Sequence, residues 1–245
     1  MIIESPIVKR FANLLADARA TDVRGDASSL AAPDYDEALA IQRRVLPLLG
    51  PLSGFKVGAF RPGQPAMAPI PSARTFPSGS DVPVREMLGI ELEVGFEILR
   101  APEPAMRHAP QDFLLPRIVL ELCDQRFDGD ALDPAVKLAD MQLNDGVVLG
   151  PALADWDGSD FGRLNARLRC GDTTVVDGEV IVPGGSALSN LWTLLDHLGN
   201  HCGGIKVGQT VITGSVSGLT EFPPGTQVDG MIVGFAPISC RLVQA

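Results

Sequence analysis

A chain of 245 residues, of which 45% are hydrophobic and 20% charged, has the length of one large domain and the composition of a globular protein. Its formal net charge of -10 and isoelectric point near 4.7 argue against binding to nucleic acid or to anionic membrane surfaces. An anionic small substrate would need a locally positive site, which a bound cation and a lysine can create in an acidic protein.

The four cysteines are scattered, without a CxxC pair or the density of a disulfide framework, so buried reduced thiols are expected. The first residues lack the basic-then-apolar order of a signal peptide, and no apolar run approaches the roughly 18 residues that span a bilayer. The sequence therefore predicts a cytoplasmic protein with free thiols at Cys123, Cys170, Cys202 and Cys240.

Two helices are expected at the start of the chain. Apolar residues recur at helical spacing from Ile7 to Ala18, and a second helical pattern follows Asp34, a candidate N-cap residue. Pro47 and Gly50 are expected to end this second helix, because neither residue favours its continuation.

A strand and a loop are expected next. The segment SGFKVGAF has strand composition and contains Lys56, and its glycines let the backbone pass close to another group. Residues 61–83 are rich in proline, glycine, serine and alanine, which predicts a long irregular loop rather than a regular element.

The rest of the chain alternates apolar strands with turns and two further helices. Strand composition marks GIELEVGFEIL, RIVLELCDQRF, GVVLG and residues 163–176, and helical patterns mark DPAVKLADMQL and SALSNLWTLLDHLGNHC. Three short strands in the C-terminal third are expected in IKVGQTVITGS, PPGTQVDGMIVGF and ISCRLVQA. We expect an α+β protein in one compact unit, with a helical segment over residues 1–50 and a β-rich, metal-binding catalytic domain over residues 51–245.

The strand GIELEVGFEIL carries acids at alternate positions. Since side chains alternate across a strand, Glu91, Glu93 and Glu97 would share one face. Adjacent carboxylates on one face repel each other, so they need either water or a cation. A solvated face is the simpler interpretation of an E-x-E motif taken alone.

Glu121 lies within the apolar run of RIVLELCDQRF, where a carboxylate is costly unless it is paired, protonated or coordinated. Three carboxylates from two neighbouring strands would suit Mg²⁺ or Mn²⁺ and leave positions open for water and substrate. A zinc site is a weaker interpretation, because no histidine or cysteine has suitable spacing. The alternative for Glu121 is a buried salt bridge with Arg126 or Lys56, and Asp124 is expected to support the site or to belong to a turn.

Several motifs in order resemble the 2-keto-4-pentenoate hydratase family of the fumarylacetoacetate hydrolase superfamily. The resemblance runs over roughly residues 35 to 240. Its motifs are Ala40-Ile41-Gln42, SGFKVG, the E-x-E strand, LELCDQR, LADMQLNDGVVLG, the Trp192 helix and GIKVGQTVITGSVSG.

The resemblance implies a β-roll or sandwich body of the fumarylacetoacetate hydrolase C-terminal type, a homo-oligomer, and a Mg²⁺ or Mn²⁺ site. The implied metal ligands are Glu91, Glu93 and Glu121, and Lys56 is implied beside the bound acid. The resemblance further implies that Asp140, Gln142, Asn144, Thr213, Gly214 and Ser215 lie near the substrate.

Two departures from the family pattern concern substrate choice. Met141 stands where related sequences commonly have asparagine, and Ala59 and Phe60 replace a frequent Leu-Thr-Ser. The three histidines lack the partner pattern of a catalytic triad, so no role is assigned to His108, His197 or His201.

The function implied by the resemblance is the metal-dependent addition of water to a 2-hydroxy-2,4-dienoate, giving a 4-hydroxy-2-oxo acid. Lys56 and Asp140 would position water and move protons. Decarboxylation of a 2-oxo diacid such as 4-oxalocrotonate is the first alternative, and C–C hydrolysis or a non-catalytic partner subunit comes after it. The expected partners are a small 2-oxo acid, other copies of the chain and a related decarboxylase.

Overall fold

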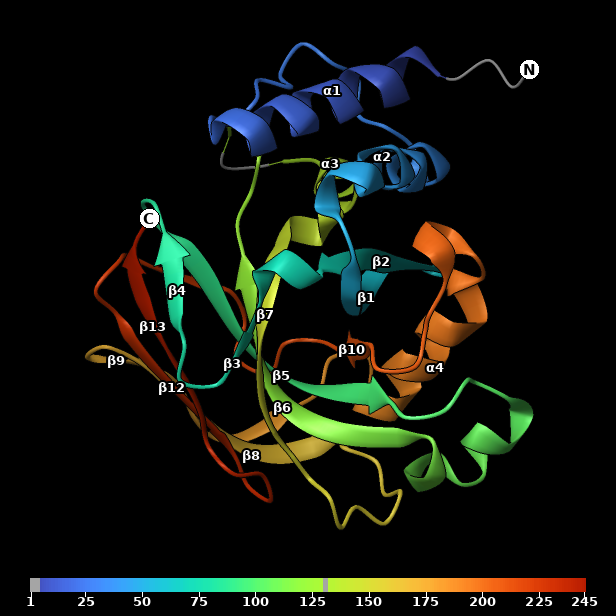
Figure 1. Cartoon of the computed structure of the whole chain (residues 1–245), viewed down its shortest axis with the longest axis vertical. Coiled ribbons are helices and arrows are strands. Elements are labelled where there is room, and N and C mark those ends of the chain that lie inside the picture. The colour runs from blue at the N-terminus through green and yellow to red at the C-terminus, as the bar shows by residue number, and fades with distance from the viewer. Residues whose placement is uncertain (1–4, 130–131) are drawn as a thin grey trace.

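The computed structural model describes residues 5–129 and 132–245, which form two β-sheets beneath a layer of helices (Figure 1). The larger sheet has eight strands in the order β2-β1-β10-β5-β6-β7-β3, with β11 paired to β5, and the smaller has the order β4-β13-β12-β8-β9. No helix in these described ranges is both long and apolar enough to cross a membrane.

The two N-terminal helices form where the apolar spacing predicts them, as α1 (Pro6–Thr21) and α2 (Tyr35–Leu49). Asp34 caps α2 in a capping box with Glu37, whose side chain accepts from the backbone N–H of Asp34. The prediction that Pro47 ends this helix was wrong, because the helix continues to Leu49. A proline in the last turn removes one hydrogen bond but keeps a helical φ, and the chain leaves the helix at Gly50, where φ is 68°.

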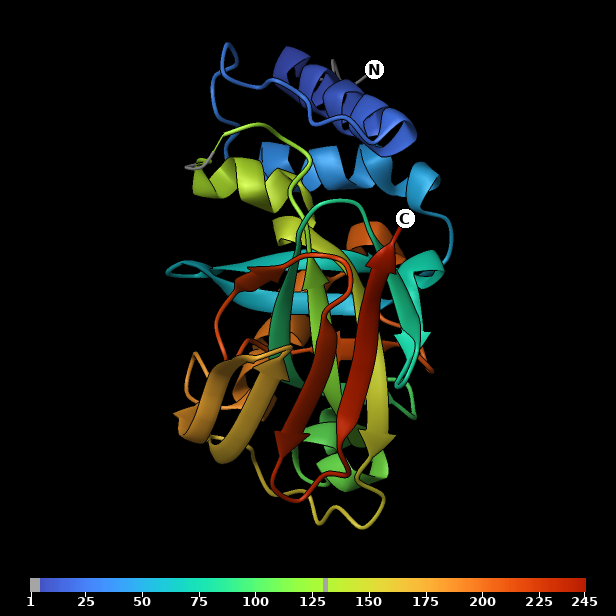
Figure 2. The same cartoon turned by 90° about the vertical axis from the view of Figure 1, so that its left-hand side faces the viewer.

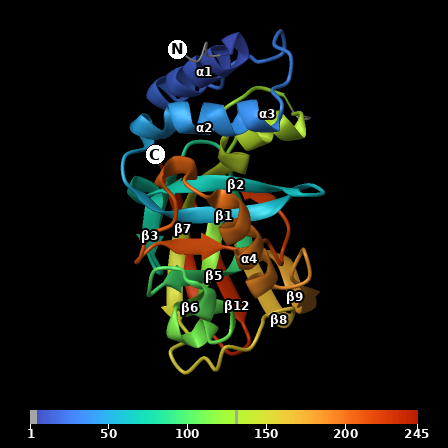
Figure 3. The ribbon, with the colours of Figure 1, turned by 90° about the vertical axis from the view of Figure 1, so that its right-hand side faces the viewer.

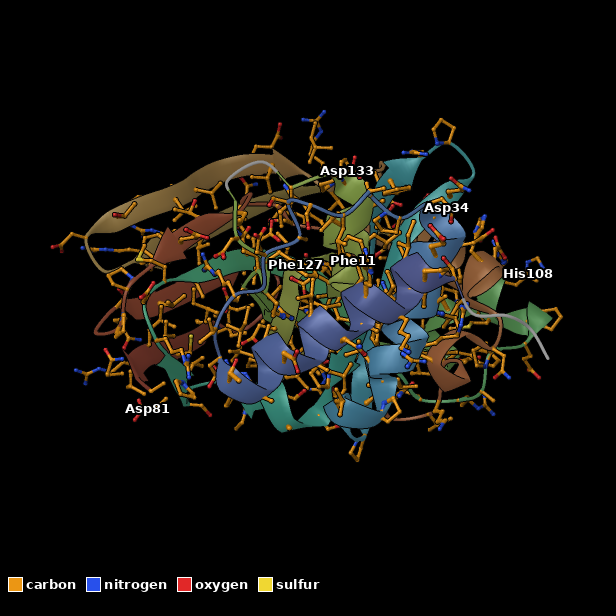
Figure 4. All side chains as sticks on the ribbon, turned by 90° about the horizontal axis from the view of Figure 1, so that it is seen from above. Phe11, Asp34, Asp81, His108, Phe127 and Asp133 are labelled. Atoms are coloured by element: carbon orange, nitrogen blue, oxygen red, sulfur yellow. The ribbon has the colours of Figure 1, made fainter. Side chains whose placement is uncertain are left out.

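Helix α1 packs on the segment that follows β6 through an aromatic contact. Phe11 of α1 packs against Phe127, with ring centroids 5.6 Å apart and nearly perpendicular planes. Both residues are labelled in Figure 4. Both side chains are fully buried, and each contributes about 1.5–3 kcal/mol of apolar burial.

The predicted loop over residues 61–83 was wrong. After β1 (Leu52–Arg61), this stretch forms β2 (Gln64–Pro71), the 3-10 turn η1 (Ser72–Arg74), β3 (Thr75–Pro77) and the start of β4 (Asp81–Val84). All three of these strands lie at sheet edges. An edge strand pairs with a neighbour on one side only, so a proline, which lacks a backbone N–H, can be accommodated on the unpaired side. Prolines therefore fit strands here, although they mimic the composition of a loop.

The centre of the larger sheet contains the predicted acidic strands. It consists of β5 (Leu88–Ile98), β6 (Leu114–Cys123) and β7 (Asn144–Ala152), with the short strands β10 (Thr210–Ile212) and β11 (Thr220–Phe222) beside β5. The antiparallel register of β5 and β6 sets Glu91 directly opposite Glu121. This register confirms that the two predicted strands are neighbours.

The segment between β6 and β7 is less helical than predicted. Helix α3 (Pro134–Ala139) ends at Asp140, and the following turn η4 (Met141–Leu143) has positive φ at all three residues, 52°, 50° and 64°. A positive φ is unfavourable for residues other than glycine, so packing and hydrogen bonds around the turn must stabilise this conformation. Its consequence is that the backbone carbonyl of Gln142 is turned towards Lys56.

The smaller sheet lies in front in Figure 2 and packs on the inner face of the larger one. Its long strands are β8 (Arg163–Cys170), β9 (Thr173–Ile181), β12 (Gln227–Ile232) and β13 (Ile238–Gln244). A Cβ at Gly230 would lie 3.1 Å from Leu92 Cδ1 of the opposite sheet, so this glycine allows the close approach of the two layers.

The remaining helix, α4 (Ala187–Leu198), begins after the capping residue Ser186 and covers β1 and β2, on the side shown in Figure 3. The chain also forms three further single turns: η2 (Pro104–Arg107), η3 (Pro110–Asp112) and η5 (His201–Gly203). The β5 residues Leu92, Val94 and Phe96 face the core between the sheets, so the acidic positions of the same strand face away from that core.

Candidate metal centre

Strands β5 and β6 bring the three predicted carboxylates together on one face of the larger sheet. Glu121 is fully buried, Glu93 is 2% exposed, and Glu91 is partly exposed. A solvated face is therefore not the explanation of this E-x-E motif, because Glu93 is buried and the facing Glu121 of β6 is buried with it. We refer to Glu91, Glu93, Glu121 and Lys56 as the acidic cluster.

Lys56 of β1 contributes the positive charge of this cluster. Its Nζ lies 2.5 Å from Glu121 Oε1 and donates a second hydrogen bond of 3.1 Å to the carbonyl oxygen of Gln142. The predicted alternative of a buried salt bridge is thus present with Lys56, whereas Arg126 pairs with a different acid. Burial alone would lower the pKa of Lys56, but Glu121 and the nearby acids raise it, so the lysine stays protonated.

Glu121 is only half satisfied by these contacts. Its Oε1 accepts from Lys56 and from Asn144 Nδ2, the latter at 2.7 Å, while its Oε2 is buried without a hydrogen-bond partner. A buried carboxylate oxygen without a partner costs about 1–3 kcal/mol or more. An oxygen in this state is the position at which a cation would be stabilised.

Glu93 is buried among like charges. Its Oε2 accepts a hydrogen bond of 2.7 Å from the backbone N–H of Gly214, and burial, followed by Glu121 and Glu91, raises its pKa well above the usual range. Burial and Glu121 also raise the pKa of Glu91. Three carboxyl groups facing one ammonium group cannot all ionise without a cost, and a divalent cation would stabilise their ionised forms.

Cys123 also belongs to this site, and it is the residue that sequence analysis missed. One ligand atom each from Glu91, Glu121 and Cys123 lie within 4.8 Å of one another, a group that does not include Glu93. The signal was present in the sequence, because Cys123 follows Glu121 by two positions in one strand and so shares its face. Cysteine was not predicted as a ligand, because no cysteine has the spacing of a zinc-binding motif. That criterion covers ligands close together in sequence, and it misses ligands that two neighbouring strands bring together.

Asp140 lies in a different set of contacts from the one predicted. It is fully buried, its Oδ1 is 3.0 Å from Arg126 Nε, and its Oδ2 accepts a 2.7 Å hydrogen bond from the Arg126 backbone N–H. Burial raises the pKa of Asp140, and Arg126 and Arg19 oppose that rise. Within the described residues its contacts join it to arginines and not to Lys56, so it supports the turn that follows α3.

The other predicted substrate residues are distributed around the acidic cluster. Asn144 orients Glu121, and the carbonyl of Gln142 holds Lys56 while Gln142 Oε1 is buried without a partner. Thr213 is fully buried, and its hydroxyl donates to the Val94 carbonyl at 2.7 Å, so that hydroxyl is engaged in the fold. Ser215 accepts a 2.9 Å hydrogen bond from Gly218 N–H, and a hydrogen bond from its side chain lowers the pKa of Glu91.

His201, to which the sequence analysis assigned no role, has structural contacts. His201 is buried, and its Nε2 lies 2.8 Å from Gln42 Oε1, while Gln42 Nε2 donates to the carbonyls of Met67 and Leu138. These contacts connect α2 with β2, α3 and η5 above the acidic cluster. Asp124, expected near the site, pairs with Arg24 at 3.3 Å on the surface.

The sequence matches no family model and no curated protein, whereas many solved structures are similar in fold. One is 4-oxalocrotonate decarboxylase from Pseudomonas putida G7, complexed with magnesium and adipate: the TM-score is 0.76 at 18% identity, covering 96% of this chain and 97% of that one. The chain has the fold of the fumarylacetoacetate hydrolase superfamily. This confirms the predicted fold class, and the hydratase family stays a prediction.

Two further similar structures have different reactions. The 5-carboxymethyl-2-hydroxymuconate delta-isomerase from Mycobacterium smegmatis matches with a TM-score of 0.53 at 16% identity, covering 80% of this chain and 81% of that one. The fumarylpyruvate hydrolase from Pseudomonas aeruginosa, in complex with Mn²⁺ and pyruvate, matches with a TM-score of 0.51 at 14% identity, covering 78% and 89%. The same fold thus carries decarboxylation, isomerisation and hydrolysis, so it does not identify the reaction.

Proposed function

We propose that this chain is a divalent-metal-dependent lyase acting on a 2-oxo acid, and that its reaction is hydration of a 2-hydroxy-2,4-dienoate to a 4-hydroxy-2-oxo acid. The observation that carries the proposal is the buried, unpartnered Oε2 of Glu121, set among two more glutamates and one lysine. The similar structures that contain magnesium, calcium or Mn²⁺ support a divalent cation for this fold.

The ligand set fits a hard cation. Glu91, Glu93 and Glu121 would hold Mg²⁺ or Mn²⁺ through carboxylate oxygens, which are the donors that these ions prefer. When bound, the cation would act as a Lewis acid towards the carboxylate and keto oxygens of a 2-oxo acid. Glu93 would remain anchored by Gly214 N–H, so it could offer its second oxygen.

Lys56 is the residue best placed to assist the reacting substrate. Its ammonium group is held by Glu121 and by the Gln142 carbonyl, so its position is fixed before any substrate arrives. From there it would stabilise the negative charge that develops on the keto oxygen as the substrate forms an enolate. Asn144 would keep the Glu121 carboxylate oriented during this step.

We prefer hydration to decarboxylation of a diacid for two reasons. The ordered motifs of the sequence resemble those of the hydratase family, and the site has little positive charge. Of the described residues, Lys56 is the cation that contacts the glutamates of the acidic cluster, so one positive side chain is available there to an anionic substrate. A diacid would need a further positive group for its distal end.

A second candidate is decarboxylation of a 2-oxo diacid. It is favoured by the similarity in fold to 4-oxalocrotonate decarboxylase, which extends over nearly the whole length of both chains. The two reactions share enolate formation and differ in the next step, which is addition of water in one and loss of carbon dioxide in the other.

The test is to follow the ultraviolet absorbance of 2-hydroxypenta-2,4-dienoate and of 4-oxalocrotonate with purified protein and Mg²⁺ or Mn²⁺, and to identify products by NMR. Metal-dependent formation of 4-hydroxy-2-oxopentanoate is expected. Release of carbon dioxide from 4-oxalocrotonate alone would replace hydration by the second candidate, and turnover of neither compound by metal-loaded protein would overturn both.

Lys56→Met separates catalysis from metal binding. Turnover is expected to fall by about 10²–10⁴-fold, whereas Mn²⁺ affinity should hold or rise, since the variant removes a cation that competes for Glu121. Arg117→Met is the matched control, because Arg117 pairs with Glu97 on the same sheet but outside the acidic cluster. Unchanged turnover in Lys56→Met would remove Lys56 from the reaction.

A further inference from the structure

The thiol of Cys123 lies next to two of the candidate metal-binding carboxylates, those of Glu91 and Glu121. Cys123 is the last residue of β6, 4% exposed, and its Sγ is 3.5 Å from Glu91 Oε2. A carboxylate oxygen of Glu121, whose Oε2 is buried and unpartnered, lies within 4.8 Å of that sulfur. The site therefore combines a thiol, a carboxylate oxygen without a partner and a second, partly exposed carboxylate.

The sheet leaves space for this thiol. Cys123 is opposite Gly89 of β5, and a Cβ at Gly89 would lie 3.0 Å from Cys123 Cβ and 2.8 Å from Leu219 Cδ1. A larger residue at position 89 would therefore press on the Cβ of Cys123 and on the Leu219 side chain. On its other side Cys123 is opposite Asn144, the residue that orients Glu121.

The distances fit a small tetrahedral site. Zinc binds thiolate sulfur at about 2.3 Å and carboxylate oxygen at about 2.0–2.2 Å, so ligand atoms of a tetrahedron lie about 3.3–3.8 Å apart. The separation of 3.5 Å between Cys123 Sγ and Glu91 Oε2 falls in this range. One carboxylate oxygen of Glu121 lies within 4.8 Å of both atoms, so a small side-chain adjustment would complete the group.

We propose that Glu91, Glu121 and Cys123 form a mixed carboxylate–thiolate site for thiophilic divalent cations, of which Zn²⁺, Co²⁺ and Cd²⁺ are representatives. Thiolate ligands select such ions over Mg²⁺, which prefers oxygen. On binding, the S–H bond of Cys123 breaks as the metal–sulfur bond forms, and the proton leaves to solvent. The inference shares two glutamates with the proposed function, and it does not depend on which reaction the protein catalyses.

The two kinds of metal ion would share ligands, so binding of one would exclude the other. A thiophilic ion held by the two glutamates and Cys123 would occupy the same carboxylates that Mg²⁺ or Mn²⁺ needs. We therefore expect Cd²⁺ to compete with Mn²⁺ for one site on the protein. No other described cysteine has two carboxylates grouped with it in this way.

The first experiment loads the metal-free, full-length protein with Co²⁺ and records the sulfur-to-cobalt charge-transfer absorption in the near ultraviolet. The band is expected in the wild type and in Cys170→Ser, a matched buried thiol of the other sheet, and it should be absent from Cys123→Ser. A band that persists in Cys123→Ser, or its absence from cobalt-loaded wild type, would overturn the proposal.

The second measurement compares two metals on the same variant. Cys123→Ser should weaken Cd²⁺ binding by about 10–100-fold while Mn²⁺ binding, followed by electron paramagnetic resonance, stays as in the wild type. An equal loss for both ions would mean that the substitution disturbs the carboxylates rather than removing a ligand, which would count against the thiolate.

A third measurement, cadmium-113 NMR, uses only the wild-type protein, so it does not depend on the folding of a variant. A resonance shifted downfield by sulfur coordination is expected, and an all-oxygen resonance would overturn the thiolate ligand. Failure of the wild type to bind Mn²⁺ would instead defeat the proposed function, so the two failures are distinguishable.

Discussion

Asn144 connects two groups of charged residues whose charges are balanced differently. Its side chain donates to Glu121 in the acidic cluster, and its carbonyl accepts from Arg126 in a neighbouring arginine–aspartate network. In that network each carboxylate has its own arginine, through the pairs Arg126–Asp140, Arg74–Asp145 and Arg24–Asp124. In the acidic cluster three carboxylates share Lys56.

The difference distinguishes charges that neutralise each other within the fold from charges that lack a full set of partners. Arg126 and Asp140 neutralise each other, and Arg126 also donates to the backbone carbonyls of Asp124 and Asn144, which holds the turn before β7. In the acidic cluster three carboxyl groups share one ammonium group and Glu121 keeps an unpartnered oxygen, an arrangement that a bound cation would complete. Each group should therefore respond differently when one charge is removed.

Glu121→Gln should have the largest effect and should act on binding. It removes the negative charge of the most buried glutamate while keeping its size, so Mn²⁺ affinity should fall by more than about 100-fold in titration calorimetry. Glu97→Gln is the control, because Glu97 pairs with Arg117 at 2.9 Å and should leave Mn²⁺ affinity unchanged. Wild-type affinity in Glu121→Gln would mean that the metal binds elsewhere.

Asp140→Asn should act on stability instead. Arg126 would be left buried without its counter-charge, so the free energy of unfolding in urea should fall by about 3–5 kcal/mol. Asp124→Asn removes the acid of an exposed pair and should cost less than about 1 kcal/mol. If Asp140→Asn were as stable as wild type but inactive, Asp140 would belong to the reaction after all.

A third buried network, around His201, has no formal charge pair and should respond to pH. Burial, together with Arg43, lowers the pKa of His201 to about 4, while in the unfolded chain it is about 6.5. Between these values the unfolded state holds the extra proton, so stability should decline as pH falls from about 6.5 to about 4, by about 3 kcal/mol in total. His201→Gln should flatten this decline in thermal unfolding, and the exposed His108→Gln should retain it.

The smallest of these effects tests the link between the two charged groups. Asn144→Ala removes the donor that orients Glu121 but leaves every charge in place, so Mn²⁺ affinity should fall by about tenfold. Gln125→Ala, whose amide bonds only to nearby backbone carbonyls, serves as the control. An unchanged affinity in Asn144→Ala would show that Lys56 alone is enough to orient Glu121.

Some features of the candidate site are properties of local sequence. The alternation of β5 determines that Glu91 and Glu93 share a face, and the same period places Cys123 beside Glu121 on β6. The capping box at Asp34 likewise lies within a few residues of the chain. Such features depend on contacts at short sequence separation, which the order of residues specifies directly.

Other features required the tertiary structure. Asp140 was expected in the reaction, but its role depends on Arg126, with which it makes contacts that a linear pattern does not indicate. The prolines of residues 61–83 form strands only because β2, β3 and β4 occupy sheet edges.

By itself, therefore, the sequence determined most of the helices and strands, their buried faces and the candidate acidic residues of the site, but not the edge strands of residues 61–83. The tertiary structure decided which charge pairs with which, because the energy of a buried charge depends on its neighbours in space, and those come from distant segments of the chain. Lys56 and Glu121 are 65 positions apart and meet only when the sheet curls. That contact, and the oxygen it leaves unpartnered, is what makes the acidic cluster a candidate metal centre.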